Sequence, residues 1–305
     1  MMEPRHIPVL VEEVMNCLGC QPHQTYVDAT LGGGGHALEI LNRTSPDGKL
    51  IGMDWDEEAI LEAGKRLVPF GERVTLLREN FIRLPQLLEK MNIPCVDGIL
   101  LDLGLSSMHI DQKERGFSFV GEAPLDMRMD QRRNQTAADL LNRLSAAELE
   151  RILLDYGEER WARRIAQSVI LERGRGPILT TEALRRIIQR AVPKRFQSHR
   201  IDPSTRTFQA LRIAVNEELS NLREFLHSGW KLLKKGGRLC IISFHSLEDR
   251  MVKTAFRSLG KGGGEPASEE PVLRVLTKKP VIPSEEERIR NPRSRSAKMR
   301  CAERL

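Results

Sequence analysis

Apolar runs alternate with segments of helical periodicity over the first third of the chain and again near its end. Five apolar runs are typical of strands, at 25–29, 49–53, 74–77, 96–103 and 239–244. Helical patterns lie around them at 9–18, 35–43, 56–67, 84–91, 203–233 (broken near Gly229) and 246–259. This alternation predicts an α/β fold, a doubly wound parallel sheet of Rossmann-like type.

The alternation stops after Asp102. From 111 to 202 the sequence offers only helical patterns, at 145–155, 158–173 and 180–192. We therefore expect an inserted helical domain at 111–202 between two parts of a sheet domain, 1–110 and 203–305. Gly260–Pro266 is predicted to be a flexible loop, and the tail after Pro283 to be extended.

A glycine-rich turn follows the first predicted strand. Four glycines at 32–35 separate Asp28 from a helical pattern, and the next strand ends at Asp54. Glycines allow positive φ and close approach of a ligand, while an acid in the place of Asp54 can accept hydrogen bonds from a ribose. A nucleoside-containing cofactor is favoured over an unliganded turn.

Two cofactors fit this turn. Gly32-x-Gly34-x-x-Ala37 formally satisfies the dinucleotide fingerprint, so a nicotinamide enzyme remains an alternative. Asp28 argues against it, because a carboxylate at the strand end repels a pyrophosphate but favours the ammonium and sulfonium of S-adenosylmethionine. The turn at 232–239 also resembles the late turn of class I methyltransferases.

Positive charge is concentrated in two blocks, although the net charge is only +6. Residues 160–200 hold eleven Lys and Arg against two acids, and residues 271–305 hold ten against four. Such surpluses favour a polyanionic partner such as a nucleic acid. No apolar run approaches a membrane span or a signal core, which predicts a cytoplasmic protein.

The five cysteines do not form a convincing metal site. Cys17 and Cys20 make a CxxC pair at the end of a helical pattern, with Gly19 as its expected C-cap, and no second pair follows at zinc spacing. Two reduced thiols are the favoured interpretation.

Asp102 and Ser106 follow the fourth predicted strand. Ligands of open α/β sheets bind beyond the carboxyl ends of the strands, so these two residues are candidates for catalysis at the reactive end of the cofactor. An exocyclic amine needs hydrogen-bond acceptors there, and most of the rate would come from alignment of the reacting atoms. The alternative is a strand-end acid with a structural role.

Three further segments carry candidate residues. Phe117 and Phe119 could stack on an extruded base or simply anchor their loop, and Arg128 could hold a phosphate. Ser246-x-x-Asp249 has the spacing of a capping box, which favours a structural role for Ser246. His245, before it, could contact substrate or organise local hydrogen bonds.

Taken together, these segments resemble the ribosomal RNA small subunit methyltransferase H family, also described as MraW-like. The resemblance spans nearly the whole chain and rests on residues 6–10, 28–36, 102–107, 115–119, 125–129, 207–212, 244–250 and 291–297. It implies a class I methyltransferase that moves a methyl group from S-adenosylmethionine to the N4 amine of a cytidine in the decoding region of bacterial 16S rRNA.

The resemblance also implies site residues. Its cofactor contacts fall on Gly34, Gly35, His36, Asp54, Phe81 and Asp102, in addition to Asp28 proposed above. A further contact falls on His109, where the family usually has Gln, and Met108 stands where it has Pro. The inserted helical domain becomes the RNA-recognition part, and 16S rRNA in the small subunit or its precursor becomes the partner.

Some alternatives remain open at this point. A nicotinamide-dependent oxidoreductase and a non-catalytic RNA-binding assembly factor are the competing functions. The oligomeric state, including a homodimer, is also left open.

Overall fold

The computed structural model describes residues 8–106, 109, 112–119, 121–197, 202–262 and 270–305. These fall into two compact units, one made of residues 1–104 and 219–305 and the other of Leu105–Glu218. We call the first the sheet unit and the second the helical unit. The helical unit thus begins and ends outside the 111–202 span expected from the sequence.

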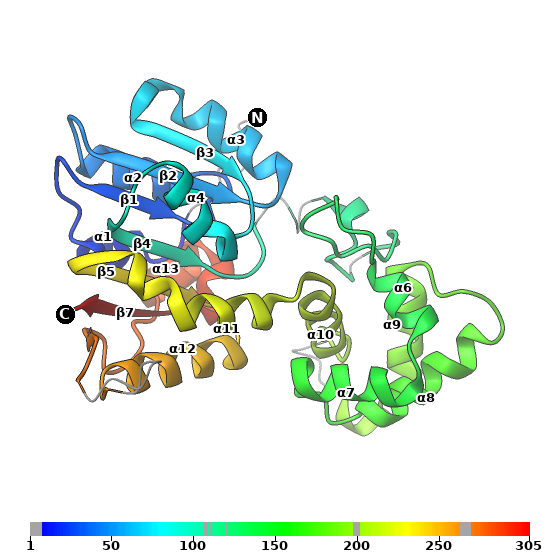
Figure 1. Ribbon diagram of the computed structural model, residues 1–305. Coiled ribbons are helices and arrows are strands. Elements are labelled where there is room, and N and C mark those ends of the chain that lie inside the picture. Colours follow the sequence, from blue (N-terminus) through cyan, green and yellow to red (C-terminus); the bar gives the residue numbers. More distant parts are fainter. Residues whose placement is uncertain (1–7, 107–108, 110–111, 120, 198–201, 263–269) are drawn as a thin grey trace. The chain divides into compact units, whose positions relative to one another are not determined.

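The sheet unit is built on seven strands in the order β3-β2-β1-β4-β5-β7-β6 (Figure 1). The strands are β1 Thr25–Asp28, β2 Lys49–Asp54, β3 Val74–Arg78, β4 Val96–Asp102, β5 Leu233–Ser243, β6 Leu273–Val275 and β7 Lys298–Arg304. The first five run parallel, and β7 is antiparallel to both β5 and β6. The predicted doubly wound α/β fold is therefore confirmed.

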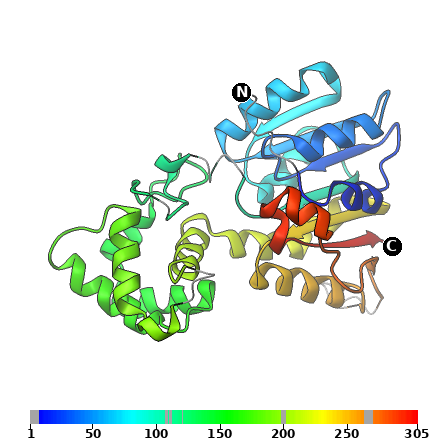
Figure 2. The same ribbon diagram turned by 180° about the vertical axis from the view of Figure 1, so that it is seen from behind.

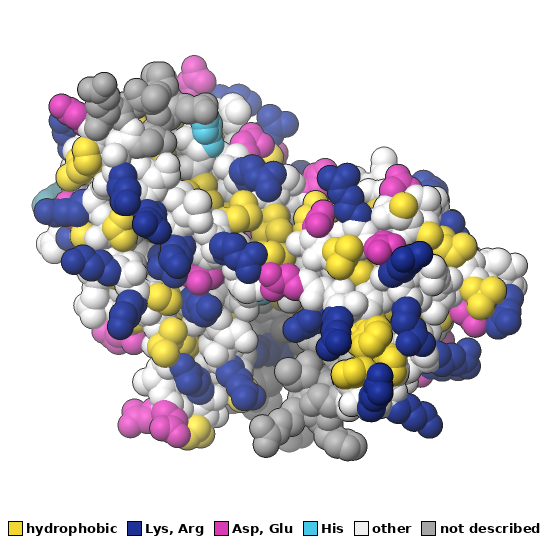
Figure 3. Space-filling view, turned by 90° about the horizontal axis from the view of Figure 1, so that it is seen from below, with side chains coloured by type: hydrophobic (Ala, Val, Ile, Leu, Met, Phe, Trp, Pro, Cys, Tyr) yellow, Lys and Arg dark blue, Asp and Glu magenta, His cyan; other side chains and the backbone are white. Residues whose placement is uncertain are grey.

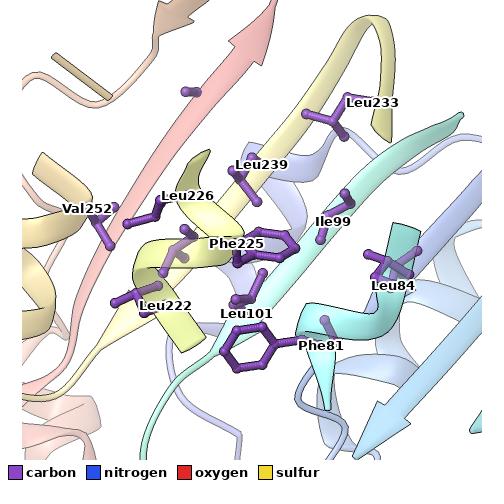
Figure 4. Packing of buried hydrophobic residues seen from close by; sticks show 14 of the residues in the cluster. Phe81, Leu84, Ile99, Leu101, Leu222, Phe225, Leu226, Leu233, Leu239 and Val252 are labelled. Atoms are coloured by element: carbon purple, nitrogen blue, oxygen red, sulfur yellow. The ribbon is translucent and has the colours of Figure 1, made fainter. Parts of the chain in front are cut away.

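Helices cover both faces of this sheet because alternate strand residues point to opposite sides. Val27, Ile99 and Leu101 pack in one cluster with α4, α11 and α12, and Tyr26 and Leu100 pack in the other with α1, α2 and α3. Figure 4 shows the first cluster, where Phe81 and Phe225 meet edge to face at 5.7 Å. The helices are α1 Val11–Leu18, α2 Gly35–Arg43, α3 Glu57–Leu67, α4 Leu84–Lys90, α11 Glu218–Ser228, α12 Ser246–Leu259 and α13 Glu285–Arg290.

The C-terminal segment differs from the expected extended tail. It forms α13 and then β7, whose residues 299–303 are buried, since β7 is an interior strand. Arg300 binds Asp249 at 2.7 Å, and Glu303 accepts from Arg238 at 3.2 Å. Arg300, one of the basic residues of 271–305, therefore stabilises the sheet itself.

The helical unit contains α6 Ala137–Arg143, α7 Ala146–Gly157, α8 Ala162–Arg173, α9 Thr181–Ala191 and α10 Thr205–Asn216 (Figure 2). The helix expected at 203–233 ends early, because Glu217 adopts a left-handed φ of 54° after Asn216. α10 packs on α7, which explains why the unit continues past residue 202.

A buried asparagine fastens the 125–129 motif to α10. The Asn216 side chain accepts from the Met129 amide at 2.8 Å and donates to the Met127 carbonyl at 2.8 Å. Met127 needs this support because its φ is +62°, a conformation that non-glycine residues rarely adopt.

Some sequence predictions lie outside the described residues: those on 1–7, Ser107, Met108, Arg200 and Gly263–Pro266. Within the described part of the chain, no helix combines the length and the apolar character that a membrane crossing demands.

Candidate functional site

Three carboxylates gather at the carboxyl edge of the sheet. Asp28 ends β1, Asp54 ends β2 and Asp102 ends β4. β1 lies between β2 and β4, and it is here that the strand order reverses. Open α/β sheets bind ligands at such a switch point, so the structure brings these three sequence-predicted residues together where a ligand is expected.

The glycine turn is shaped by two different demands. Gly34 caps α2 with a φ of 73°, and a Cβ there would meet the Ala63 Cβ at 3.2 Å. A Cβ on Gly35 would meet the Pro8 ring at 2.9 Å, so this glycine is needed for packing within the protein. Gly33 alone among these three faces open space, which leaves its backbone accessible to a ligand.

Asp28 is a buried acid. Only 1% of the residue is exposed, and its Oδ1 accepts a long hydrogen bond of 3.4 Å from the Thr30 amide. Burial, only partly offset by that hydrogen bond, raises its pKa to about 7, and the charge of Asp54 adds to the increase. A cation bound nearby would stabilise the ionised carboxylate.

Asp102 is held by its backbone and has an unused oxygen. Its amide donates to the Thr30 Oγ1 at 2.5 Å, which joins the β1 loop to the end of β4. Its side chain is 18% exposed, but Oδ1 is shielded and lacks a hydrogen-bond partner among the described residues. Burial first, then the charges of Asp28 and Glu248, raise the pKa of Asp102 well above its ordinary value.

His36, which follows the glycine turn, lies next to Asp102. Its Nε2 lies 2.8 Å from the Val9 carbonyl oxygen, which can only accept, so Nε2 carries a proton and donates. Its Nδ1 faces Asp102 Oδ2 at 3.6 Å. This separation is too long for a hydrogen bond, so the predicted cofactor residue lies beside Asp102 without fixing its orientation.

Asp54 and Phe81 occupy the side of the site toward β2 and β3. The carboxylate of Asp54 accepts from the amides of Gly32 at 2.9 Å and Asp56 at 3.0 Å, which fixes its orientation. Phe81 begins the short helix η2 Phe81–Arg83 after β3 and packs on Phe225 with 9% of the residue exposed. Its contribution to a ligand site is therefore a small apolar edge.

The structure corrects the prediction for the segment after β5. The capping box of α12 is formed by His245 and Glu248, one residue before the predicted Ser246 and Asp249 pair. His245 Nδ1 accepts from the Glu248 amide at 3.4 Å, and Glu248 Oε2 accepts in return from the His245 amide at 3.3 Å. An imidazole nitrogen replaces the usual hydroxyl cap, which favours the organising role of His245 and explains why the serine spacing misled.

The remaining candidates belong to the helical unit. Ser106 and His109 contact each other, with Ser106 Oγ 3.1 Å from His109 Nδ1. Phe117 is buried against His109, with ring centroids 5.0 Å apart. Phe119 packs edge to face on Phe208 at 5.4 Å. The two phenylalanines therefore fit the loop-anchor interpretation better than base stacking.

Arg128, a candidate for phosphate binding, is engaged within its own loop. Its guanidinium forms two hydrogen bonds of 2.7 Å to the Asp126 carboxylate and donates to the Arg133 carbonyl at 2.5 Å. The neighbouring Arg115 donates to the carbonyls of Arg128 and Met129 at 2.9 and 3.0 Å. These arginines stabilise the 115–129 loop.

Thr30 and Glu248 are the residues that sequence reasoning missed. Thr30 sits two residues after Asp28, and Glu248 lies within the recognised 244–250 segment. No pattern in the sequence reveals that the Thr30 hydroxyl accepts a hydrogen bond from the Asp102 amide. Nor does it reveal that the charge of Glu248 raises the pKa of Asp102.

The arrangement suits a cationic nucleoside ligand. Two buried or half-buried acids of raised pKa favour positive charge, an oriented carboxylate at Asp54 can accept from a ribose, and the accessible Gly33 backbone allows close approach. The shielded Asp102 Oδ1 still requires a donor. These observations fit S-adenosylmethionine better than a dinucleotide, whose pyrophosphate would meet Asp28.

Comparisons with known proteins give a consistent result. A family model described as the MraW methylase family matches residues 3–305. Ribosomal RNA small subunit methyltransferase H of Geotalea uraniireducens is 52% identical, and that of Geotalea daltonii 51%, each over 100% of both chains. The enzyme of the same name from Symbiobacterium thermophilum is 48% identical over 98% of this chain and 96% of its own.

Among solved structures, a SAM-dependent O-methyltransferase from Thermotoga maritima aligns over 98% of this chain and 72% of its own. Its TM-score is 0.40 at 12% identity.

Proposed function

Because this chain belongs to the MraW methylase family, we propose that it methylates the N4 amine of a cytidine in 16S rRNA. Membership confirms the resemblance carried by the sequence motifs, and it makes the chain a methyltransferase that uses S-adenosylmethionine. The observation that carries the proposal is the trio of acids, Asp28, Asp54 and Asp102, at adjacent strand ends.

Each acid has a separate part in holding the methyl donor. Asp28 offers a buried carboxylate to positive charge, and Asp54, fixed by two backbone amides, accepts from the ribose hydroxyls. When bound, S-adenosylmethionine supplies a methyl group on a positively charged sulfur. The protein has only to bring the nitrogen nucleophile into line with that carbon, and such alignment accounts for most of the rate.

Asp102 is the acceptor we assign to the target amine. Its side chain is 18% exposed at the edge of the sheet, so the carboxylate can accept an N–H of the cytosine amine there and favour the pyramidal nitrogen that attacks carbon. The Thr30 hydroxyl holds the backbone of Asp102 in place, and His36 lies beside its carboxylate. With the methyl donor bound, the amine nitrogen would bond to the methyl carbon as the carbon–sulfur bond breaks, and the resulting ammonium would be acidic enough to release its proton to water.

The test uses small ribosomal subunits from a bacterial strain that lacks its own enzyme. Purified protein and S-adenosylmethionine with a labelled methyl group are added, the rRNA is digested to nucleosides, and the labelled nucleoside is identified by mass spectrometry. We expect N4-methylcytidine. Label found only in protein or in another nucleoside would overturn the assignment of the substrate.

Two variants make the test specific for the site. Asp102→Ala should lower the methylation rate at least about 100-fold, as expected when one preorganised polar partner of the transition state is removed. Asp47→Ala removes an acid of the same unit that pairs with the exposed His23, and it should methylate like the unaltered protein. Equal rates for the two variants would contradict the role of Asp102.

The competing functions have distinct outcomes. Family membership favours a methylase over the nicotinamide-dependent oxidoreductase, and NAD should leave the thermal unfolding temperature unchanged while S-adenosylmethionine raises it. A non-catalytic assembly factor would bind subunits without transferring the label.

A further inference from the structure

Two aromatic rings meet on the surface of the helical unit with arginines around them. Trp161 caps the start of α8, and Phe196 ends the short helix η4 Lys194–Phe196, which follows α9. Their ring centroids are 5.2 Å apart with an angle of 46° between the planes. We propose that this cluster, Trp161 and Phe196 with Arg160, Arg164 and Arg195, binds an unpaired base of single-stranded RNA. The proposal rests on the proposed rRNA substrate and names a site for it.

The first support is that these rings are not used to build a core. Phe196 is 42% exposed and Trp161 is half-buried. The two rings come from different helices and meet at the surface of the unit. An exposed large aromatic side chain forgoes the free energy of burial, and clusters of such side chains often mark binding sites. Figure 3 shows exposed hydrophobic side chains of this unit among Lys and Arg side chains.

The second support is the arrangement of cations on the rings. The guanidinium carbons of Arg160 and Arg195 lie 5.0 and 4.9 Å from the centre of the Phe196 ring. Arg160 and Arg164 lie 5.4 and 5.7 Å from the centre of the Trp161 ring. Two cations therefore share each ring. Like charges so close repel one another, and a phosphate between them would relieve that repulsion.

The third support is that these three arginines have no other role in the described structure. Five of the other arginines of the basic block contact an acid or a carbonyl: Arg173, Arg175, Arg185, Arg186 and Arg190. Among the residues that the structure describes, Arg160, Arg164 and Arg195 have no acidic partner. Their positive charge remains available to a polyanion.

A hollow beside η4 extends the basic surface. Arg186, Arg190 and Lys194 contribute to its lining, and its volume is about 420 Å³. η4 thus supplies Lys194 to the hollow and Phe196 to the aromatic cluster. A strand of RNA that stacks one base on the rings can place adjoining phosphates over these cations.

The combination favours single-stranded RNA over a duplex. Aromatic rings and guanidinium planes stack on any base whose face is free, whereas the bases of a duplex are already stacked on one another. Proteins that bind single strands combine such rings with a basic surface, as this cluster does.

The first experiment measures binding of a fluorescent single-stranded RNA oligonucleotide and of inorganic polyphosphate, which carries phosphates without bases. Phe196→Ala should weaken RNA binding about 5- to 100-fold, the effect of losing one base-stacking contact, and leave polyphosphate binding unchanged. Arg160→Gln should weaken the binding of both RNA and polyphosphate. It should also reduce the slope of RNA affinity against salt concentration by about the amount that one phosphate contact contributes. Leu171→Ala, which removes another exposed apolar side chain of α8, should change neither.

A second experiment reports on stacking directly and does not depend on a destabilising variant. The chain has three tryptophans, so Trp55→Phe with Trp230→Phe leaves Trp161 as the sole emitter. Single-stranded RNA should quench its fluorescence, and double-stranded RNA and polyphosphate should not. Equal effects of Phe196→Ala on RNA and polyphosphate, or an unquenched Trp161 in the RNA complex, would overturn the proposal.

These outcomes are separate from the proposed function. If the unaltered protein produces N4-methylcytidine while Phe196→Ala binds RNA normally, the enzyme assignment stands and the stacking site is wrong. If Phe196→Ala weakens the binding of an isolated ribosomal protein and leaves RNA binding unchanged, the cluster binds protein, and the proposal again fails.

Discussion

Asp28→Asn tests the electrostatics of the site most directly. The change keeps the shape of a side chain that is only 1% exposed and removes its charge. Because burial raises the pKa of Asp28 from 3.8 to about 7, the folded protein holds this proton more tightly than the unfolded chain does. The stability contributed by the protonated form is fully present below the unfolded pKa and is lost as the pH rises through the folded pKa.

The magnitude follows from the size of this shift. The increase is about 3 pKa units, and at about 1.4 kcal/mol per unit the ionised carboxylate lowers the free energy of unfolding by about 4 kcal/mol at high pH. Roughly half of that loss falls between about pH 5.5 and about pH 8.5. The Asn variant has no carboxylate to ionise at this position. The difference in unfolding free energy between variant and unaltered protein should therefore shift by about 2 kcal/mol in favour of the variant from the lower to the higher pH. The pKa of Asp102 should fall too, because one of its like-charged neighbours is gone.

The assay is urea unfolding of the ligand-free protein, followed by far-UV circular dichroism at the two pH values. S-adenosylmethionine then supplies a second comparison at the higher pH, where the unaltered protein should gain more stability than the variant because its Asp28 carboxylate meets a cation. Identical pH dependence of the two proteins would refute the argument that a buried, ionisable Asp28 governs this site.

Three other substitutions test individual contacts. Thr30→Val removes the acceptor of the Asp102 amide, so the free energy of unfolding should fall by about 1–3 kcal/mol while Thr30→Ser retains it, as urea titration will report. Gly34→Ala places a Cβ at a φ of 73°, and calorimetry should find a loss of about 1–2 kcal/mol. Asn216→Ala leaves both the Met129 amide and the Met127 carbonyl without their partner, which should cost about 2–4 kcal/mol and increase proteolysis of the 125–129 segment; normal resistance would contradict its fastening role.

The sequence predicted the parallel part of the sheet because each buried strand there is a short apolar run. It did not reveal β6 or β7. β7 reads Lys-Met-Arg-Cys-Ala-Glu-Arg, and its charged residues suggest solvent, yet Arg300 and Glu303 are accommodated in the interior of the sheet by Asp249 and Arg238. Pairing between distant charges leaves no local pattern.

The site shows the same division between local and distant information. Asp28, Asp54 and Asp102 could be predicted, because each stands where an apolar run ends and parallel strands end at one edge. The hydrogen bond that fixes the Asp102 backbone comes from Thr30, at the end of a neighbouring strand, and only the structure reveals it. The cap at His245 was missed because sequence rules for caps favour hydroxyl and carboxylate oxygens over imidazole.

The discontinuous sheet unit imposes an order on protein synthesis. β4 emerges from the ribosome long before β5, its neighbour, because the whole helical unit is made between them. Until translation has passed Ser243, the nascent chain presents β4 as an open edge, the kind of strand that pairs with foreign chains. The helical unit lies wholly between β4 and β5 in the sequence, so it can fold during that interval and shorten the effective loop that β5 must close.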